Sequence, residues 1–182
     1  MTRTIFVALA IVAGTGAIGA QTPPAATPPA TAATAATAPP DCRAPEHRQF
    51  DFWLGSWNVT VAGKPAGTNR IESVMNGCGL LEQWTAARGS RGTSLNFYDR
   101  RTKTWSQAWI DESGNALQLS GAFADGRMVL TSAPRRTDRG VDVQRITWSQ
   151  NPDGTVRQLW ESSVDGGTTW TIAFDGVYTR RP

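Results

Sequence analysis

The chain has 182 residues, of which 40% are hydrophobic and 18% are charged, and its formal net charge is +3. The basic residues are scattered and never stand more than two in a row, which excludes the concentrated basic patch of a nucleic-acid-binding domain. One histidine and two cysteines are too few for the usual zinc ligand sets, so we expect no metal site and no cofactor.

The first twenty residues have the three parts of a secretory signal peptide. Arg3 gives the basic start, an apolar run extends from Ile5 to Val12, and small residues lead up to Ala20. Because a membrane span needs about 20 apolar residues, we expect no integral membrane segment after cleavage; a retained anchor is the alternative. The pattern predicts export to the periplasm or the extracellular space.

Residues 21–40 consist only of Gln, Thr, Pro and Ala, a composition that cannot bury enough surface to offset the entropy lost on ordering. We expect a disordered spacer there, followed by one domain at 41–182. In an exported chain, two cysteines predict a disulfide bond between Cys42 and Cys78. Two free thiols are the alternative, and the sequence leaves the oligomeric state open.

Turn-forming sequences recur at short intervals through this domain, among them Lys64–Gly67, Asp125–Gly126 and Asn151–Gly154. The segments between them are rich in aromatic and β-branched residues and predict about ten short strands. That many strands in one domain favours an all-β, antiparallel up-and-down barrel, because closure removes exposed edges; a sandwich is the alternative. A short helical turn is expected within 44–54, with Pro45 in its first turn.

The segment Phe50–Val59, which contains Gly55-Ser56-Trp57, resembles the opening of calycin-type barrels. This resemblance implies that Gly55 permits a tight entry into the first strand and that Trp57 plugs the closed end of the barrel. It also implies that an arginine of the last strand, Arg180 or Arg181, covers the tryptophan.

Much of the remaining domain resembles an exported, lipocalin-like bacterial family of unknown function. The resemblance lies in Leu80–Trp84, Ser94–Asp99, Trp105–Trp109 and Phe174–Tyr178. Nitrobindin-like barrels, which share this architecture, hold haem through a histidine of a late strand. The only histidine here is His47, far from such a position, so haem is not expected.

Residues Ser163–Trp170 match the Asp-box pattern S-x-D-x-G-x-T-W. In such a turn the carboxylate of Asp165 accepts backbone N–H groups, Gly167 provides a positive φ and Trp170 packs beneath the hairpin. We therefore expect a structural hairpin and no sialidase activity. Alternation also places Trp170, Ile172 and Phe174 on one face of the last strand.

Three tryptophans share a strand face with a polar residue two positions away: Glu82 with Trp84, Gln107 with Trp109, and Gln158 with Trp160. If these faces point into the barrel, they form a pocket with aromatic walls and a few hydrogen-bonding groups, as in small-molecule sites. If they point outward, they are ordinary surface pairs.

Glu82 is the sharpest single candidate, because a carboxyl group facing a cavity has its pKa raised by desolvation. We expect Arg145 or Arg157 as its counter-charge, and Asn96 is a further candidate ligand-binding residue; a solvated Glu82 on an outer face is the alternative. The leading hypothesis is an exported barrel that binds a small apolar or amphipathic molecule. The alternatives are a cofactor-independent hydrolase or isomerase that uses Glu82, and a scaffold without a cavity; no catalytic residue is assigned.

Overall fold

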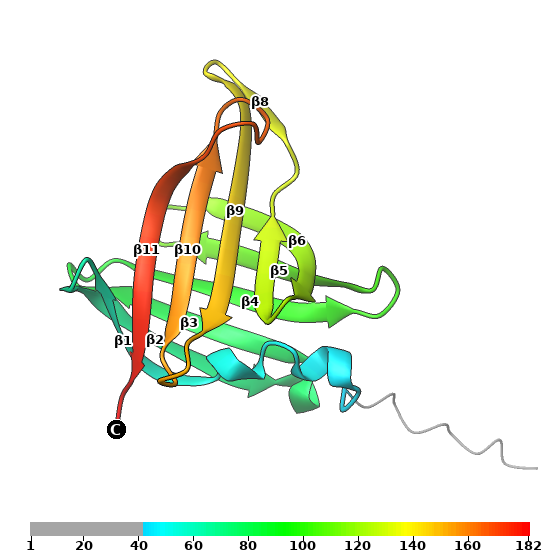
Figure 1. The fold of residues 1–182 in the computed structure, drawn as a ribbon, viewed down its shortest axis with the longest axis vertical. Helices are drawn as coiled ribbons and strands as arrows, with labels where there is room; N and C mark the ends of the chain where they lie inside the picture. Colours follow the sequence, from blue (N-terminus) through cyan, green and yellow to red (C-terminus); the bar gives the residue numbers. More distant parts are fainter. Residues whose placement is uncertain (1–41) are drawn as a thin grey trace, which may run out of the picture. The chain divides into compact units, whose positions relative to one another are not determined.

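A computed structural model describes residues 42–182, so the predicted signal peptide (1–20) and spacer (21–40) lie outside the described residues. The described chain is almost entirely β-structure (Figure 1). Its strands are β1 (Gly55–Val61), β2 (Lys64–Val74), β3 (Gly79–Ala86), β4 (Arg91–Asp99), β5 (Thr104–Asp111), β6 (Ala116–Ala124), β7 (Arg127–Thr131), β8 (Arg135–Thr137), β9 (Gly140–Gln150), β10 (Val156–Ser163) and β11 (Thr171–Arg180). Three short 3₁₀ helices accompany them: η1 (Pro45–Arg48), η2 (Asp51–Trp53) and η3 (Met75–Gly77).

The strands form a closed antiparallel barrel, as the turn spacing predicts. Consecutive strands pair from β1 to β7, β7 pairs with β9, β9 with β10, β10 with β11, and β11 returns to β1. Ten strands therefore complete the circle, and the short β8 pairs only with β9 as an extension of it. Closure leaves none of these ten strands with an unpaired edge, which is the physical advantage that favours the architecture.

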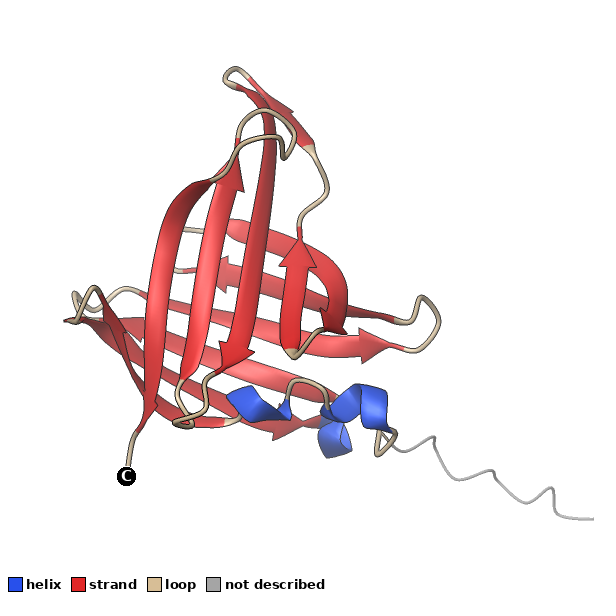
Figure 2. Ribbon diagram, viewed as in Figure 1, coloured by secondary structure: helices blue, strands red, loops and turns tan. Residues whose placement is uncertain are grey.

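Aromatic side chains fill one end of the barrel, which we call the closed end. Phe50 stacks on Trp53 with ring centroids 4.9 Å apart, and Trp148 contacts both rings. Trp57 and Tyr178 pack beside this pair, and all five side chains are fully buried. The predicted helical turn is present as η1 and η2, with Pro45 in its first turn, and these segments lie along the lower edge of the barrel in Figure 2.

The predicted disulfide bond joins Cys42 to Cys78. It links the start of the described chain to the connection between β2 and β3, next to η3. The side chain of Arg48 also donates a hydrogen bond to the carbonyl of Gly77, so the segment that carries Phe50 and Trp53 is tied to the barrel on the same side.

The prediction that Ile172 and Phe174 share a face is wrong. A β-bulge interrupts the pairing of β10 with β11, so that Trp160 lies opposite Phe174 while Glu161 lies opposite Ile172. The extra residue turns the two side chains to opposite faces, and Ile172 is 61% exposed.

No helix within residues 42–182 is long and apolar enough to cross a membrane.

Candidate functional site

A cavity of about 170 Å³ lies inside the barrel, at the end away from the Phe50–Trp53 plug. Its walls are mostly aromatic, with polar groups at a few positions. The lining residues are Glu82, Trp84, Gln107, Trp109, Leu117, Ile146, Gln158, Trp160, Phe174 and Tyr178. For comparison, an engineered apolar cavity of about 150 Å³ holds one benzene molecule, so this space suits a small ligand.

All three tryptophan–polar pairs singled out from the sequence face this cavity. Of the two orientations left open by the sequence, the strand faces that carry them point into the barrel. Glu82 and Trp84 come from β3, Gln107 and Trp109 from β5, and Gln158 and Trp160 from β10. Within each pair the two residues are spaced by two and so share a strand face. In each strand the tryptophan follows the polar residue and so lies nearer the C-terminal end of the strand, which is the same end of the barrel for all three.

Glycines of neighbouring strands make room for the aromatic walls. A Cβ on Gly92 of β4 would lie only 2.2 Å from the indole of Trp109, and one on Gly67 of β2 would lie 2.7 Å from that of Trp84. The Trp84 ring also meets Phe174 edge to face, with centroids 6.2 Å apart. The walls therefore depend on positions without side chains as well as on the rings themselves.

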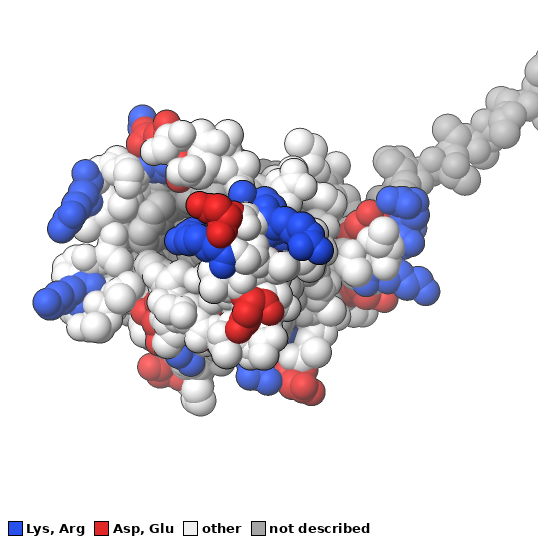
Figure 3. Space-filling model, turned by 90° about the horizontal axis from the view of Figure 1, so that it is seen from above, with Lys and Arg blue, Asp and Glu red and all other residues white. Residues whose placement is uncertain are grey.

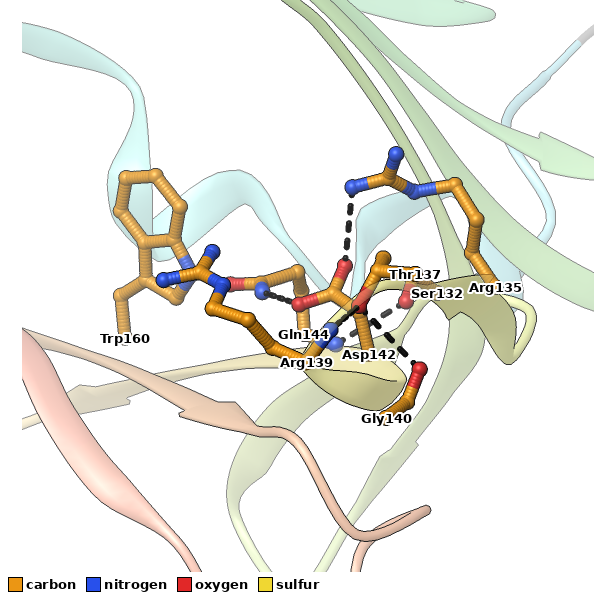
Figure 4. A network of polar contacts seen from close by, with 8 residues as sticks. All are labelled: Ser132, Arg135, Thr137, Arg139, Gly140, Asp142, Gln144 and Trp160. Atoms are coloured by element: carbon orange, nitrogen blue, oxygen red, sulfur yellow. Dashed lines mark hydrogen bonds and ion pairs between the residues drawn. The ribbon is translucent and has the colours of Figure 1, made fainter.

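A chain of polar contacts fixes the third tryptophan at the rim (Figure 4). The indole N–H of Trp160 donates to Oε1 of Gln144 (2.7 Å), and Nε2 of Gln144 donates to Asp142 (2.8 Å). Arg135 of β8 forms an ion pair with the other oxygen of Asp142 at 3.4 Å. The β8–β9 hairpin thus holds the Trp160 side chain in place from outside the cavity.

A larger groove of about 880 Å³ continues from the cavity and shares Trp109, Leu117 and Trp160 with it. Its charged lining residues are two acids and two bases, namely Asp111, Asp142, Arg135 and Arg139. Figure 3, which looks down on the end of the molecule where β8 lies, shows acidic and basic side chains interspersed. The approach to the cavity is therefore electrostatically balanced.

Glu82 lies deep in the cavity, and the residue is only 4% exposed. Its Oε1 accepts a hydrogen bond from Nδ2 of Asn69 (2.7 Å), and its Oε2 accepts one from the hydroxyl of Ser94 (2.6 Å). Both donors are neutral, and none of the ten residues that line the cavity is basic. The charge of this carboxylate is therefore unmatched by the cavity wall.

The hydrogen bonds around Ser94 determine which group its hydroxyl proton is donated to. Asn96 Nδ2 donates to Ser94 Oγ at 2.8 Å, and Gln107 Nε2 donates to Asn96 Oδ1 at 2.9 Å and more distantly to Ser94. Because Ser94 accepts from these amides, its own proton is directed at Glu82. On the other side of the carboxyl group, Asn69 also contacts the hydroxyl of Tyr178 (3.4 Å), which donates to Gln158.

Burial is the largest influence on the pKa values of the two titratable groups in this network, Glu82 and Tyr178. Desolvation raises the pKa of Glu82, and the hydrogen bonds from Ser94 and Asn69 oppose that rise without cancelling it. Burial, followed by the nearby Glu82 charge, holds the pKa of Tyr178 well above its usual value. Tyr178 is therefore a neutral phenol at physiological pH, and Glu82 is the group on the cavity wall that can change its charge.

The prediction that Arg145 or Arg157 is the counter-charge of Glu82 is wrong, because both arginines pair with other acidic residues. Arg145 is paired with Glu161 (2.9 Å) and covers the ring of Trp170 at 4.0 Å, on the opposite face of its strand from Ile146. Arg157 is likewise paired with Asp175 at 2.7 Å. Alternation explains both, because each arginine directly adjoins an inward-facing residue.

Asn96 is fully buried beneath the cavity and contacts Ser94 and Gln107. Three participants in the network, Asn69, Ser94 and Tyr178, were missing from the predicted site. For two of them the signal was the spacing by two, since Asn69 shares a face with buried Ile71, and Ser94 shares one with Asn96. In β4 the polar residues face inward, while Leu95 is 41% exposed.

Ser163–Trp170 forms a tight turn outside the cavity. Both carboxylate oxygens of Asp165 accept hydrogen bonds, from the backbone of Thr168 and from the backbone and hydroxyl of Thr169. Gly167 adopts φ +94° and donates its N–H to Ser163. These contacts hold the pKa of Asp165 well below its usual range. None of these residues lines the cavity.

Among the described residues, no group of three or more His, Cys, Asp or Glu side chains is arranged to hold a metal ion. His47 is buried at the closed end, where its ring meets Tyr98 edge to face. The cavity can therefore offer aromatic surfaces, amide groups and one carboxyl group. No protein-family model matches the chain, and no curated protein matches it either.

Proposed function

We propose that this protein is an exported, lipocalin-like binding barrel that takes a small apolar or amphipathic molecule into the cavity around Glu82. One observation carries the proposal: three tryptophan–polar pairs from separate strands converge on a single interior space. Flat apolar walls with a few fixed polar groups are the usual composition of small-molecule sites.

The arrangement of the polar groups also supports binding. They lie at the inner end of the cavity and the tryptophans lie toward the rim, so a ligand enters with its polar end first. Trp160 is held through Gln144, and Trp109 lies over Gly92, so the walls are largely formed before the ligand arrives. A preformed site loses less entropy on binding.

The hydrolase or isomerase alternative receives less support. It required Glu82 to act with Arg145 or Gln107, but Arg145 lies on the outer face with Glu161. Gln107 does not bond the carboxyl group and reaches it only through Ser94, either directly or by way of Asn96. The scaffold alternative required a filled interior, whereas the barrel encloses about 170 Å³ of space.

Native mass spectrometry of the purified protein, followed by tryptophan fluorescence with a panel of lipids, isoprenoids, small aromatics and amines, tests the proposal. We expect either a co-purified small molecule or saturable fluorescence changes from Trp84, Trp109 and Trp160. A Trp109→Leu variant removes one wall and should reduce the affinity. The absence of both a co-purified molecule and any saturable change across the panel would refute binding.

Export rests on the signal-peptide pattern of residues 1–20 and agrees with the Cys42–Cys78 bond, since disulfides persist in oxidising compartments. In a bacterial host we expect the protein in the periplasmic or culture fraction, with an N-terminus that begins after Ala20. A cytoplasmic protein that retains Met1 would contradict export and leave the binding proposal untouched.

A further inference from the structure

We infer that the cavity selects a small organic cation, with a substituted ammonium group seated between the Glu82 carboxylate and the aromatic walls. This inference rests on the proposed binding function and names the chemical class of the ligand. It follows from three features of the described residues: the donors around Glu82, the charges of the cavity lining and the identity of the walls.

The first feature is the set of donors that surrounds the carboxyl group. Asn69 and Ser94 each direct a proton at one oxygen of Glu82, and Ser94 is held in that orientation by the amide of Asn96. Both side chains that contact the carboxyl oxygens donate to them, as the hydrogen bonding of a carboxylate requires. These donors favour the charged form of Glu82 and oppose the desolvation that raises its pKa.

The second feature is that the cavity lining supplies no cation to neutralise that charge. None of the lining residues is basic, and the two arginines expected as counter-charges, Arg145 of β9 and Arg157 of β10, are paired outside the barrel with Glu161 and Asp175. A buried carboxylate without a counter-ion is costly, as the raised pKa of Glu82 reflects. A cationic ligand provides the missing charge.

The third feature is the wall itself. Three tryptophans, Phe174 and Tyr178 surround the space next to Glu82. Aromatic faces attract alkylated ammonium groups through their quadrupoles, and tryptophan does so most strongly. A neutral amphipathic molecule gains the same apolar contact but not this attraction, and an anion is repelled by Glu82. The wall and the carboxylate therefore favour the same sign of charge.

Three probes of nearly equal shape separate these cases: choline, its neutral carbon analogue 3,3-dimethyl-1-butanol, and the anion 3,3-dimethylbutanoate. Binding to the purified full chain is measured by isothermal titration calorimetry at neutral pH. We expect choline to bind at least about tenfold more tightly than the alcohol, and the anion to bind most weakly. This comparison in the wild-type protein needs no variant.

Glu82→Gln provides the residue-specific test, with Glu72→Gln as its matched control. Glu72 also lies in the sheet but on an exposed face, where it pairs with Arg70 at 2.6 Å. We expect Glu82→Gln to reduce the choline-to-alcohol affinity ratio at least about fivefold, while Glu72→Gln leaves it unchanged. If Glu82→Gln fails to fold, Trp84→Leu is used, which should weaken choline binding more than alcohol binding.

The pH dependence gives an independent readout. Choline affinity should rise with pH through the raised pKa of Glu82 and stay level in Glu82→Gln, because the other titratable group on the lining, Tyr178, remains neutral. If the alcohol binds as tightly as choline, the cation inference is overturned while the binding function stands. If neither these probes nor the broader panel binds, the binding function itself fails.

Discussion

The guanidinium group of Arg180 lies 4.5 Å above the ring of Trp57 and donates a hydrogen bond to the carbonyl of Leu54 at 3.1 Å. The contact joins the last strand to the first at the closed end of the barrel. Gly55 makes it geometrically feasible, since a Cβ there would lie 2.5 Å from the guanidinium and its φ is +129°. Of the two arginines named from the sequence, Arg180 is therefore the one over Trp57.

Replacing Arg180 with alanine should lower the free energy of unfolding by about 1 kcal/mol, through loss of the cation–π contact and the hydrogen bond. Arg180→Lys should recover only part of this, because an ammonium cannot stack as a plane. Urea denaturation measures both. Arg181→Ala removes an equal charge one residue later, and an equal loss in that variant would show that the stacking contributes nothing.

Asp165 should govern stability in the acid range. Its folded pKa is depressed by hydrogen bonds from Thr169 and Ser163, so its contribution is present above the unfolded pKa of about 4 and is lost as pH falls through the folded value. The difference in Tm between the wild type and Asp165→Asn should be large at neutral pH and shrink below about pH 4. The corresponding difference for Asp138→Asn, in the exposed β8–β9 turn, should stay near zero, and parallel wild-type and Asp165→Asn curves would contradict this role.

Glu82 acts in the opposite direction and in a different pH window. Because its folded pKa is raised by burial, the folded state is favoured while the group is protonated, and stability falls as pH rises from about 4.3 through the folded pKa. The decline can reach about 1.4 kcal/mol per pH unit. Urea denaturation across pH 4.5–8 should show this slope in the wild type and in Glu72→Gln but not in Glu82→Gln. Equal slopes in all three proteins would place a different group behind the effect.

The Cys42–Cys78 bond closes a loop with a sequence separation of 36 residues and should contribute about 3–4 kcal/mol in the chain-entropy model. We expect reduction to shift the urea midpoint downward. The double variant Cys42→Ser/Cys78→Ser should behave like the reduced protein and no longer respond to reductant. A reduced protein as stable as the oxidised one would show that the plug around Phe50 holds without the bond.

The strand pattern was predictable because period-two alternation and turn residues are local signals. The same alternation excludes Arg145 from the interior, because it places Arg145 on the face opposite Ile146 and Trp148, which are both buried. The inward direction of the three tryptophan pairs was not predictable. Period two shows that Glu82 and Trp84 share a face, whereas closure of the barrel decides which face that is.

Two further features depend on contacts between strands that are distant in sequence. Ser94 lies directly opposite Glu82 and Asn96 opposite Gln107 in the register of β3, β4 and β5, so the polar network exists only once the strands pair. The bulge beside Trp160 is likewise set by the pairing of β10 with β11. No local signal reports that the interior at this depth is polar, with Ser94 and Asn96 buried and Leu95 41% exposed.

Gly92 offers the sharpest test of the cavity wall. Its φ lies outside the positive range, so alanine fits the backbone there, but the new Cβ would lie 2.2 and 2.3 Å from two atoms of the Trp109 indole. The ring must therefore shift, and the spaces that it borders are the cavity and the adjoining groove. Gly92→Ala should therefore weaken ligand binding about tenfold while costing about 1 kcal/mol or less, at the low end of overpacking penalties.

The matched control for this variant is Gly79→Ala. Gly79 also has a φ outside the positive range, and a Cβ there approaches no atom closer than 3.3 Å, in a region away from the cavity. Calorimetry with choline and thermal unfolding should show normal binding in Gly79→Ala and impaired binding with near-normal Tm in Gly92→Ala. Unimpaired binding in Gly92→Ala would mean that Trp109 does not contact the ligand. The contacts with the cation would then come from Trp84, Trp160 and Glu82.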